Sequence, residues 1–240
     1  MPVDNFAILR TGKLKSLRHI ESAAKHNYRM IPVRHLLNSN KDKVIKNDYL
    51  SVMPSTRALM PKKIRKNGVL AIEVILSLSP AYFRPNNPDA CGEFESDAYE
   101  NFEQSAVAFA NSAFGDANIV SFVSHLSESS PHCHILFVPI DPRGRLNAAH
   151  FVGSPQILRD LQTKWASHVA PLGIKRGIDA RKTRRSHVPI ARFYAILRKL
   201  GLATLAAYAR SNIGIAFDNI GSKLLEMRAK RTGRKFELKR

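Results

Sequence analysis

Three histidines fall within ten residues of one another, in the segment His-Leu-Ser-Glu-Ser-Ser-Pro-His-Cys-His. His132 and His134 are two residues apart, so on a β-strand both side chains project from one face while Cys133 projects from the other. If residues 127–131 reverse the chain, His125 on the neighbouring strand lies opposite them. Three imidazoles then converge and leave further coordination positions open, which is the arrangement that a catalytic metal needs.

The alternatives to a catalytic metal site are histidines that only pack and a structural zinc site. A lone buried histidine is more often a packing residue than a ligand, but three at matched positions on two strands favour a shared ion. A structural zinc site needs a fourth Cys or His, and Cys133 faces the wrong side. Imidazole ligands alone leave Zn²⁺, Mn²⁺, Ni²⁺ and Co²⁺ open.

Alternating stretches of strand and helix patterning surround these histidines and must position them. β-Branched and aliphatic runs predict strands, and apolar residues at helical spacing predict helices. The predicted strands are 5–9, 69–78, 119–126 and 132–140, and the predicted helices are 17–25, 95–114 and 155–170. Together these elements predict an α+β fold, in which a central antiparallel β-sheet is flanked by helices and presents the histidines.

The chain is strongly basic, with 38 Lys and Arg against 19 Asp and Glu and a formal net charge of +19 over 240 residues. Such an excess favours a polyanionic partner, because each Lys or Arg that neutralises a phosphate releases condensed counterions. Nucleic acid is the first expectation, and a ribosome-associated or membrane-surface protein is the alternative on charge alone. Residues 223–240 contain eight Lys or Arg and only two acids, which indicates a basic C-terminal segment.

The remaining composition predicts a cytoplasmic protein without a membrane partner. Two cysteines far apart in sequence, Cys91 and Cys133, are no disulfide framework and fit a reducing compartment. The first residues lack the basic and apolar regions of a signal peptide. The most apolar tracts, 69–83 and 200–209, are too short to span a bilayer. Neither composition nor motifs define an oligomeric state.

The histidine segment resembles the metal motif of the MobV/Pre mobilisation relaxases, which are HUH endonucleases. That motif reads His-hydrophobic-Asp-Glu-Ser/Thr-x-Pro-His-x-His. Glu128 matches its Glu, whereas Ser127 stands where the motif has Asp. The missing carboxylate predicts altered metal affinity rather than inactivity, because Ser127 can still accept a hydrogen bond.

Further segments are similar to the family in the same order along the chain. Residues 25–29, Lys-His-Asn-Tyr-Arg, resemble its N-terminal His-Asn-x-Arg motif, and 47–50 resemble its second, Asn-centred motif. Residues 64–70 resemble the basic segment before a central strand, and His187 resembles a histidine before the last core helix. The resemblance implies an HUH relaxase domain over 1–195, followed by a basic helical extension over 196–240.

The resemblance implies site-specific single-strand DNA nicking and strand transfer, for plasmid mobilisation or recombination. His26 would be the nucleophile that forms a covalent bond to a 5′-phosphate, and Glu128 would accept its proton or orient its ring. A neutral imidazole is nucleophilic near its unperturbed pKa of about 6.5. His125, His132 and His134 would hold a divalent metal, expected to be Mn²⁺, with Mg²⁺, Zn²⁺, Ni²⁺ or Co²⁺ as alternatives.

The expected partner is single-stranded or hairpin DNA at an origin-like nick site. The predicted DNA contacts are Arg29, Asn47, Arg65, Lys66, Arg184 and Arg185. One alternative is an HUH replication initiator or transposase that uses Tyr28. Those enzymes usually place the nucleophile after the histidine motif, whereas His26 precedes it here by about a hundred residues. The other alternative is a non-catalytic, basic DNA-binding regulator.

Overall fold

The computed structural model describes residues 4–32, 42–179 and 182. The chain divides into two units, Met1–Arg184 and Arg185–Arg240, and the described residues all belong to the first. The predicted domain boundary at 195 and the predicted extension therefore lie outside the described residues. The same holds for Arg184, Arg185 and His187.

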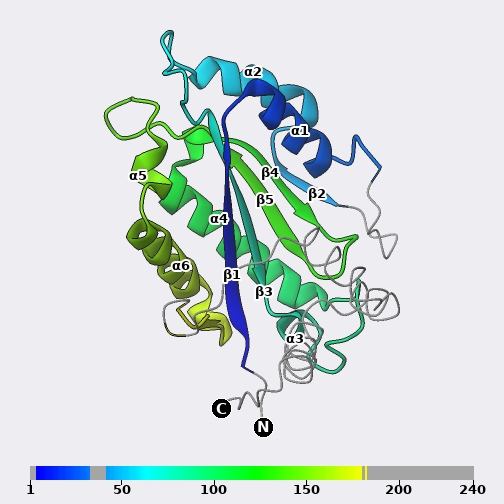
Figure 1. The fold of residues 1–240 in the computed structure, drawn as a ribbon. Helices are drawn as coiled ribbons and strands as arrows, with labels where there is room; N and C mark the ends of the chain where they lie inside the picture. Colours follow the sequence, from blue (N-terminus) through cyan, green and yellow to red (C-terminus); the bar gives the residue numbers. More distant parts are fainter. Residues whose placement is uncertain (1–3, 33–41, 180–181, 183–240) are drawn as a thin grey trace, which may run out of the picture. The chain divides into compact units, whose positions relative to one another are not determined.

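Six strands form one mixed sheet in the order β2-β4-β5-β3-β1-β6. Their bounds are β1 Phe6–Leu14, β2 Lys43–Lys46, β3 Ala71–Leu78, β4 Ile119–His125, β5 His132–Phe137 and β6 Lys175–Arg176. All neighbours pair antiparallel except β1 and β6, which pair in parallel at one edge. The predicted α+β fold with a central antiparallel sheet flanked by helices is confirmed (Figure 1).

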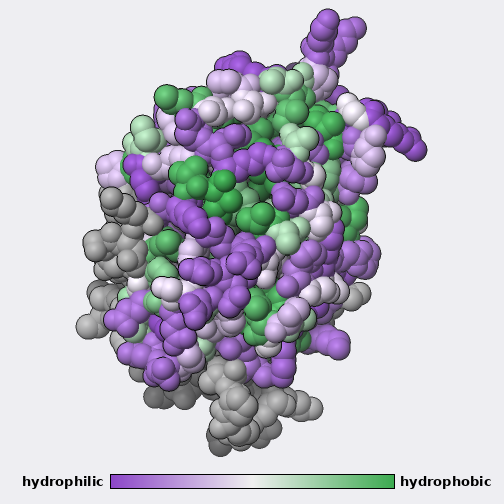
Figure 2. All heavy atoms as spheres, turned by 180° about the vertical axis from the view of Figure 1, so that it is seen from behind, coloured by the Kyte–Doolittle hydropathy of each residue, from purple (hydrophilic) through white to green (hydrophobic). Residues whose placement is uncertain are grey.

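Helices pack on both faces of this sheet. Their bounds are α1 Leu17–Asn27, α2 Tyr49–Leu59, α3 Pro80–Phe83, α4 Ser96–Phe114, α5 Ala148–Val152 and α6 Pro155–Val169, with 3₁₀ turns η1 Asp116–Asn118 and η2 Ala170–Leu172. Seen from behind (Figure 2), the surface is mostly hydrophilic with hydrophobic residues between, as expected where amphipathic helices turn their polar sides outward.

The alternation of β5 shows which face carries the histidines. Cys133, Ile135 and Phe137 belong to the larger core, which also contains the buried residues of α4 and most of those of α6. Leu136 instead packs in a smaller core with Ala24 of α1 and Val52 of α2. Because side chains alternate along a strand, the even-numbered residues of β5 face α1 and α2. His132 and His134 therefore lie on the face that α1 and α2 cover.

The structure differs from the sequence expectations mainly near α1 and β2. Helix α1 continues two residues past the predicted end, so that it includes His26. The polar stretch expected to be a loop over 38–48 contains the short edge strand β2, whose Val44 is half exposed. Helix α2, with Pro54 inside it, was not predicted. Edge strands and proline-containing helices carry weak local signals, because tertiary contacts stabilise them.

Within residues 4–32, 42–179 and 182, no helix has the length and apolarity that a membrane span requires.

Phe102 on α4 is fully buried, with ring centroids 5.3 Å from Phe83 and 6.1 Å from Trp165. We expect Phe102→Ala to lower the free energy of unfolding by about 3–5 kcal/mol. The substitution leaves a cavity, and the neighbouring aromatic rings are too rigid to fill it. Urea denaturation followed by circular dichroism measures this. Glu100→Ala, on the exposed side of the same helix, is the control. Equal midpoints for the two variants would contradict the packing role of Phe102.

Candidate active site

The pairing of β4 with β5 brings three histidines together. His125 lies directly opposite His132, and Val123 lies opposite His134. The ring centroids of His125 and His134 are 4.4 Å apart, and each of these rings lies 5.1 Å from that of His132. The structure thus places the three predicted ligands in one cluster, on the sheet face that α1 and α2 cover.

Among the described residues, one nitrogen of each of these rings forms a hydrogen bond with an oxygen. The pairs are His125 Nε2 with the Asn27 carbonyl at 2.9 Å, His132 Nδ1 with the Ser130 carbonyl at 2.9 Å, and His134 Nδ1 with Glu73 Oε1 at 3.0 Å. A carbonyl or carboxylate oxygen only accepts, so the bonded nitrogen carries the proton. In a neutral imidazole the other nitrogen then has a free lone pair. Those nitrogens are His125 Nδ1, His132 Nε2 and His134 Nε2.

The residues present fit a divalent metal ion. Within the part of the chain that the structure describes, His125 Nδ1 is buried without a hydrogen-bond partner, which is costly for a polar atom unless a ligand takes it up. Burial lowers the pKa of His132 and lowers that of His134 well below its ordinary value, so both favour the neutral form that binds metal. The carbonyl and carboxylate partners behind the rings are those typical of metal-binding histidines.

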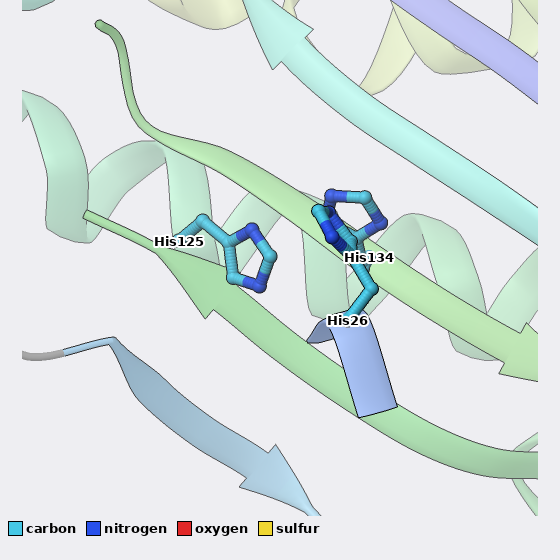
Figure 3. A group of neighbouring side chains, drawn as sticks. All are labelled: His26, His125 and His134. Atoms are coloured by element: carbon cyan, nitrogen blue, oxygen red, sulfur yellow. The ribbon is translucent and has the colours of Figure 1, made fainter. Parts of the chain in front are cut away.

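His26 comes from the last turn of α1 and points toward the same cluster (Figure 3). Its ring centroid lies 5.7 Å from that of His125 and 5.5 Å from that of His134. One ring nitrogen from each of these three histidines lies within 4.8 Å of the others. Burial, and then the proximity of His125, lower the pKa of His26, which favours its neutral form. His26 is therefore placed to act as a nucleophile or as a further ligand.

Asn27 and Tyr28 hold the end of α1 against the sheet. Asn27 is fully buried, and its Nδ2 donates to Glu73 Oε1 at 3.3 Å in addition to its carbonyl bond with His125. The Tyr28 hydroxyl donates to the Asn47 carbonyl at 2.8 Å and accepts from Ser121 Oγ at 3.1 Å. Burial raises the pKa of Tyr28. Its hydroxyl is thus engaged in the fold, whereas the His26 ring lies in the cluster.

Glu128 lies between His125, His132 and Arg29. Its Oε1 is 2.8 Å from Arg29 Nη1 and 3.5 Å from His125 Nδ1, and its Oε2 is 3.9 Å from His132 Nε2. Burial raises its pKa, but the two histidines and Arg29 together hold it well below its ordinary value. Among the described residues, His26 forms no ion pair with a carboxylate. The geometry therefore favours Glu128 as an orienting group or further ligand at His125 and His132.

The other predicted DNA contacts have different surroundings. Arg29 is largely enclosed, with ion pairs to Asp42 and Glu128. The Asn47 side chain donates to the Val120 carbonyl at 3.1 Å, and its backbone φ is +57°. Both thus hold the framework of the site. Arg65 and Lys66 are exposed beyond the opposite end of β3 from the histidines.

Arg65 lines a cavity of about 270 Å³, and no histidine lines it. The other lining residues are Pro61, Lys63, Ile64, Gly68, Val69, Gly144, Arg145, Leu146 and Ala148. The structure therefore does not bring Arg65 to the histidine cluster.

Two carboxylates of the site were not predicted from the sequence. Glu73 is the single acid in the apolar strand β3, and that isolation was a usable signal. Burial raises its pKa, although Asn27 and nearby histidines act in the opposite direction. Asp42 precedes β2 in a stretch rich in Lys and Asn, where nothing local distinguishes it. Only the tertiary structure brings it to Arg29.

Comparisons with known proteins identify the family of the chain. A family model described as plasmid recombination enzyme, Mob_Pre, matches residues 3–195. A 65 kDa protein of Zymomonas mobilis is 30% identical over 207 residues, which cover 81% of this chain and 33% of that protein. A plasmid recombination enzyme type 3 of Staphylococcus aureus is 25% identical over 205 residues, which cover 79% of this chain and 47% of that enzyme. The chain thus spans a third to a half of these relatives.

Solved structures share the fold. The MobM relaxase domain, bound to Mn and to plasmid pMV158 oriT DNA, has a TM-score of 0.66 at 20% identity, covering 80% of this chain and 99% of that one. A second MobM structure, also Mn-bound and with oriT DNA, has a TM-score of 0.66 at 21% identity, covering 79% and 99%. The match of the family model over most of the chain decides the family. The chain belongs to the Mob_Pre family of plasmid recombination enzymes.

Proposed function

We propose that this chain is a metal-dependent DNA relaxase. It nicks one strand at a specific site, stays attached to the 5′-phosphate, and serves plasmid mobilisation or recombination. The observation that carries the proposal is the placement of the His26 ring beside His125 and His134, with one ring nitrogen of each within 4.8 Å of the others. MobM structures that contain Mn and oriT DNA support it, as do the plasmid recombination enzymes among the relatives.

His125 Nδ1, His132 Nε2 and His134 Nε2 would hold the metal. His125 and His134 form a group with His26, and His125 and His132 form a second group with Glu128, the ligand atoms of each group lying within 4.8 Å of one another. Mn²⁺ is the expected ion. When bound, it supplies polarisation of the scissile phosphate and stabilises the charge that develops on its oxygens. The protein contributes rings that Asn27, Ser130 and Glu73 hold in one orientation and one tautomer.

His26 is the proposed nucleophile. Its neutral imidazole attacks the phosphorus, a P–N bond forms, and the bond from phosphorus to the 3′-oxygen breaks. The ring proton is lost and the departing 3′-oxygen gains one, so that a phosphoramidate with an uncharged ring and one negative charge on its phosphate oxygens results, together with a free 3′-OH. Because the P–N bond remains reactive, a returning 3′-OH reverses the step and seals the strand. Glu128, held as a carboxylate, orients His125 and His132 and balances the charge of Arg29.

DNA would be held by exposed basic residues, some of which lie away from the histidine cluster. We propose Arg65 and Lys66 as phosphate contacts, because both side chains are exposed, whereas Arg29 and Asn47 act by holding the site together. Arg184, Arg185 and a basic extension over 196–240 would add sequence-independent affinity. Action on plasmid DNA implies a cytoplasmic protein.

The nucleophile is tested by nicking of a supercoiled plasmid that carries the region upstream of the encoding gene, with Mn²⁺ or with EDTA. We expect His26→Ala to lower the rate by about 10³-fold or more, because the attacking atom is lost. Tyr28→Phe should nick at nearly the wild-type rate and lose about 1 kcal/mol of stability with its hydrogen bonds. His19→Ala, on the exposed face of the same helix, is the control.

The same assay separates the alternatives. Loss of nicking and of the covalent protein–DNA adduct in Tyr28→Phe alone would move the protein to the tyrosine-using HUH enzymes. Tight binding of DNA without nicking by the wild type, on the correct origin, would favour a regulator.

The metal site is tested by calorimetric titration of the apoprotein with Mn²⁺. Loss of an outer partner of a metal ligand costs about 10- to 100-fold in affinity, so His125→Ala, which removes a ligand, should cost more than about 100-fold. The wild type should also gain about 2.7 kcal/mol of stability at a Mn²⁺ concentration of 100 times Kd, and EDTA should abolish that gain. Equal Mn²⁺ affinities for His125→Ala and His19→Ala would refute the assignment of the ligands.

A further inference from the structure

Asp42 directly precedes the edge strand β2 and connects it to the turn that carries Glu128. Its Oδ1 accepts hydrogen bonds from the backbone N–H of Leu126 at 2.8 Å and of Ser127 at 3.2 Å, and from Ser127 Oγ at 3.0 Å. Its Oδ2 accepts from Arg29 Nε and forms an ion pair with it. One carboxylate thus holds two segments that are distant in sequence.

Arg29 continues this chain of contacts to the histidines. Its Nη2 donates to Ser127 Oγ at 3.3 Å, and its Nη1 lies 2.8 Å from Glu128 Oε1. The same Glu128 oxygen is 3.5 Å from His125 Nδ1, the nitrogen left free for a metal. The side chains of Arg29, Asp42 and Glu128 are 19%, 12% and 21% exposed, so water screens these charges only weakly.

Removal of Asp42 would leave the guanidinium of Arg29 with Glu128 as its only carboxylate partner in the described structure. Arg29 would then draw Glu128 away from His125, because a half-buried cation needs a compensating anion. The backbone N–H groups of Leu126 and Ser127 would also lose their acceptor at the start of the turn. The altered ion pair and the lost hydrogen bonds would both displace the turn that carries Glu128.

We propose that Asp42 is a positioning residue of the metal site. By neutralising Arg29 and tying down the turn after β4, it keeps Glu128 beside His125 and His132. Asp42, directly before β2, supplies the carboxylate that position 127 lacks, since Ser127 Oγ contacts both Asp42 and Arg29. This inference rests on the proposed metal function and assigns a residue that lies outside the histidine segment.

The test compares Asp42→Asn with Asp116→Asn in the full chain. The first substitution keeps an oxygen acceptor for the turn but removes the negative charge facing Arg29. The second removes an ion pair of 2.6 Å with Lys46, which ties the other end of β2 and touches no histidine. We expect Asp42→Asn to weaken Mn²⁺ binding by about 10-fold and to alter the EPR spectrum of bound Mn²⁺. Asp116→Asn should leave both unchanged.

A rescue variant distinguishes positioning from general destabilisation. In Asp42→Asn combined with Ser127→Asp, a carboxylate again faces Arg29, now from the turn after β4, so Mn²⁺ affinity should recover to within about 3-fold of the wild type, a change smaller than the loss of an outer partner. If Mn²⁺ affinity does not recover although circular dichroism shows both variants folded, a carboxylate at position 127 cannot replace the one at position 42, and the proposed role of the Asp42 charge is overturned.

The remaining outcomes separate this inference from the proposed function. If the wild type binds Mn²⁺ and Asp42→Asn binds it equally well, Asp42 has no positioning role and the proposed function stands. The positioning role is also overturned if Asp42→Asn and Asp116→Asn lose equal affinity, because the effect then comes from β2 in general. If the wild type fails to bind Mn²⁺ in calorimetry and in EPR, the metal function and this inference are both overturned.

Discussion

The register between β4 and β5 is the constraint on which the site depends. It places His125 opposite His132 and, through the alternation of β5, puts His134 on the same face. Because side chains alternate along a strand, a slip of one residue would turn these rings into the large core that contains Phe137 and Trp165. That core therefore specifies the register as strongly as the histidines do. Burying the wrong face would place three imidazoles among aromatic side chains.

Hydrogen bonding then decides which nitrogen each ring offers. The end of α1, the turn before β5 and the centre of β3 each provide one oxygen acceptor, and each acceptor takes one ring N–H. Asn27 orients two of the rings. Its carbonyl accepts from His125, and its side-chain amide donates to Glu73, which in turn accepts from His134. The nucleophile candidate and the orientation of the ligands are thus linked through consecutive residues, His26 and Asn27. A shift of α1 would disturb both together.

The charges within the site are locally balanced, although the whole chain carries a net charge of +19. Asp42 and Glu128 flank Arg29, so the carboxylate beside His125 and His132 is already stabilised by a cation. This arrangement keeps Glu128 ionised without leaving an uncompensated charge in a half-buried place. The excess of positive charge is therefore available at the surface, where exposed groups such as Arg65 and Lys66 attract a polyanion without disturbing the site.

The sequence by itself determined the elements with strong local periodicity and the cluster of histidines. The strand–turn–strand segment, the apolar strand β3 and helices α4 and α6 follow from patterning, since each buries one continuous face. Local spacing also predicted that His125, His132 and His134 converge. Only the tertiary structure decided that His26 joins them across about a hundred residues, that Tyr28 turns to Ser121, and that Asp42 and Glu73 complete the surroundings. The physical reason is that ion pairs and hydrogen bonds between distant segments leave no periodic signal in the sequence.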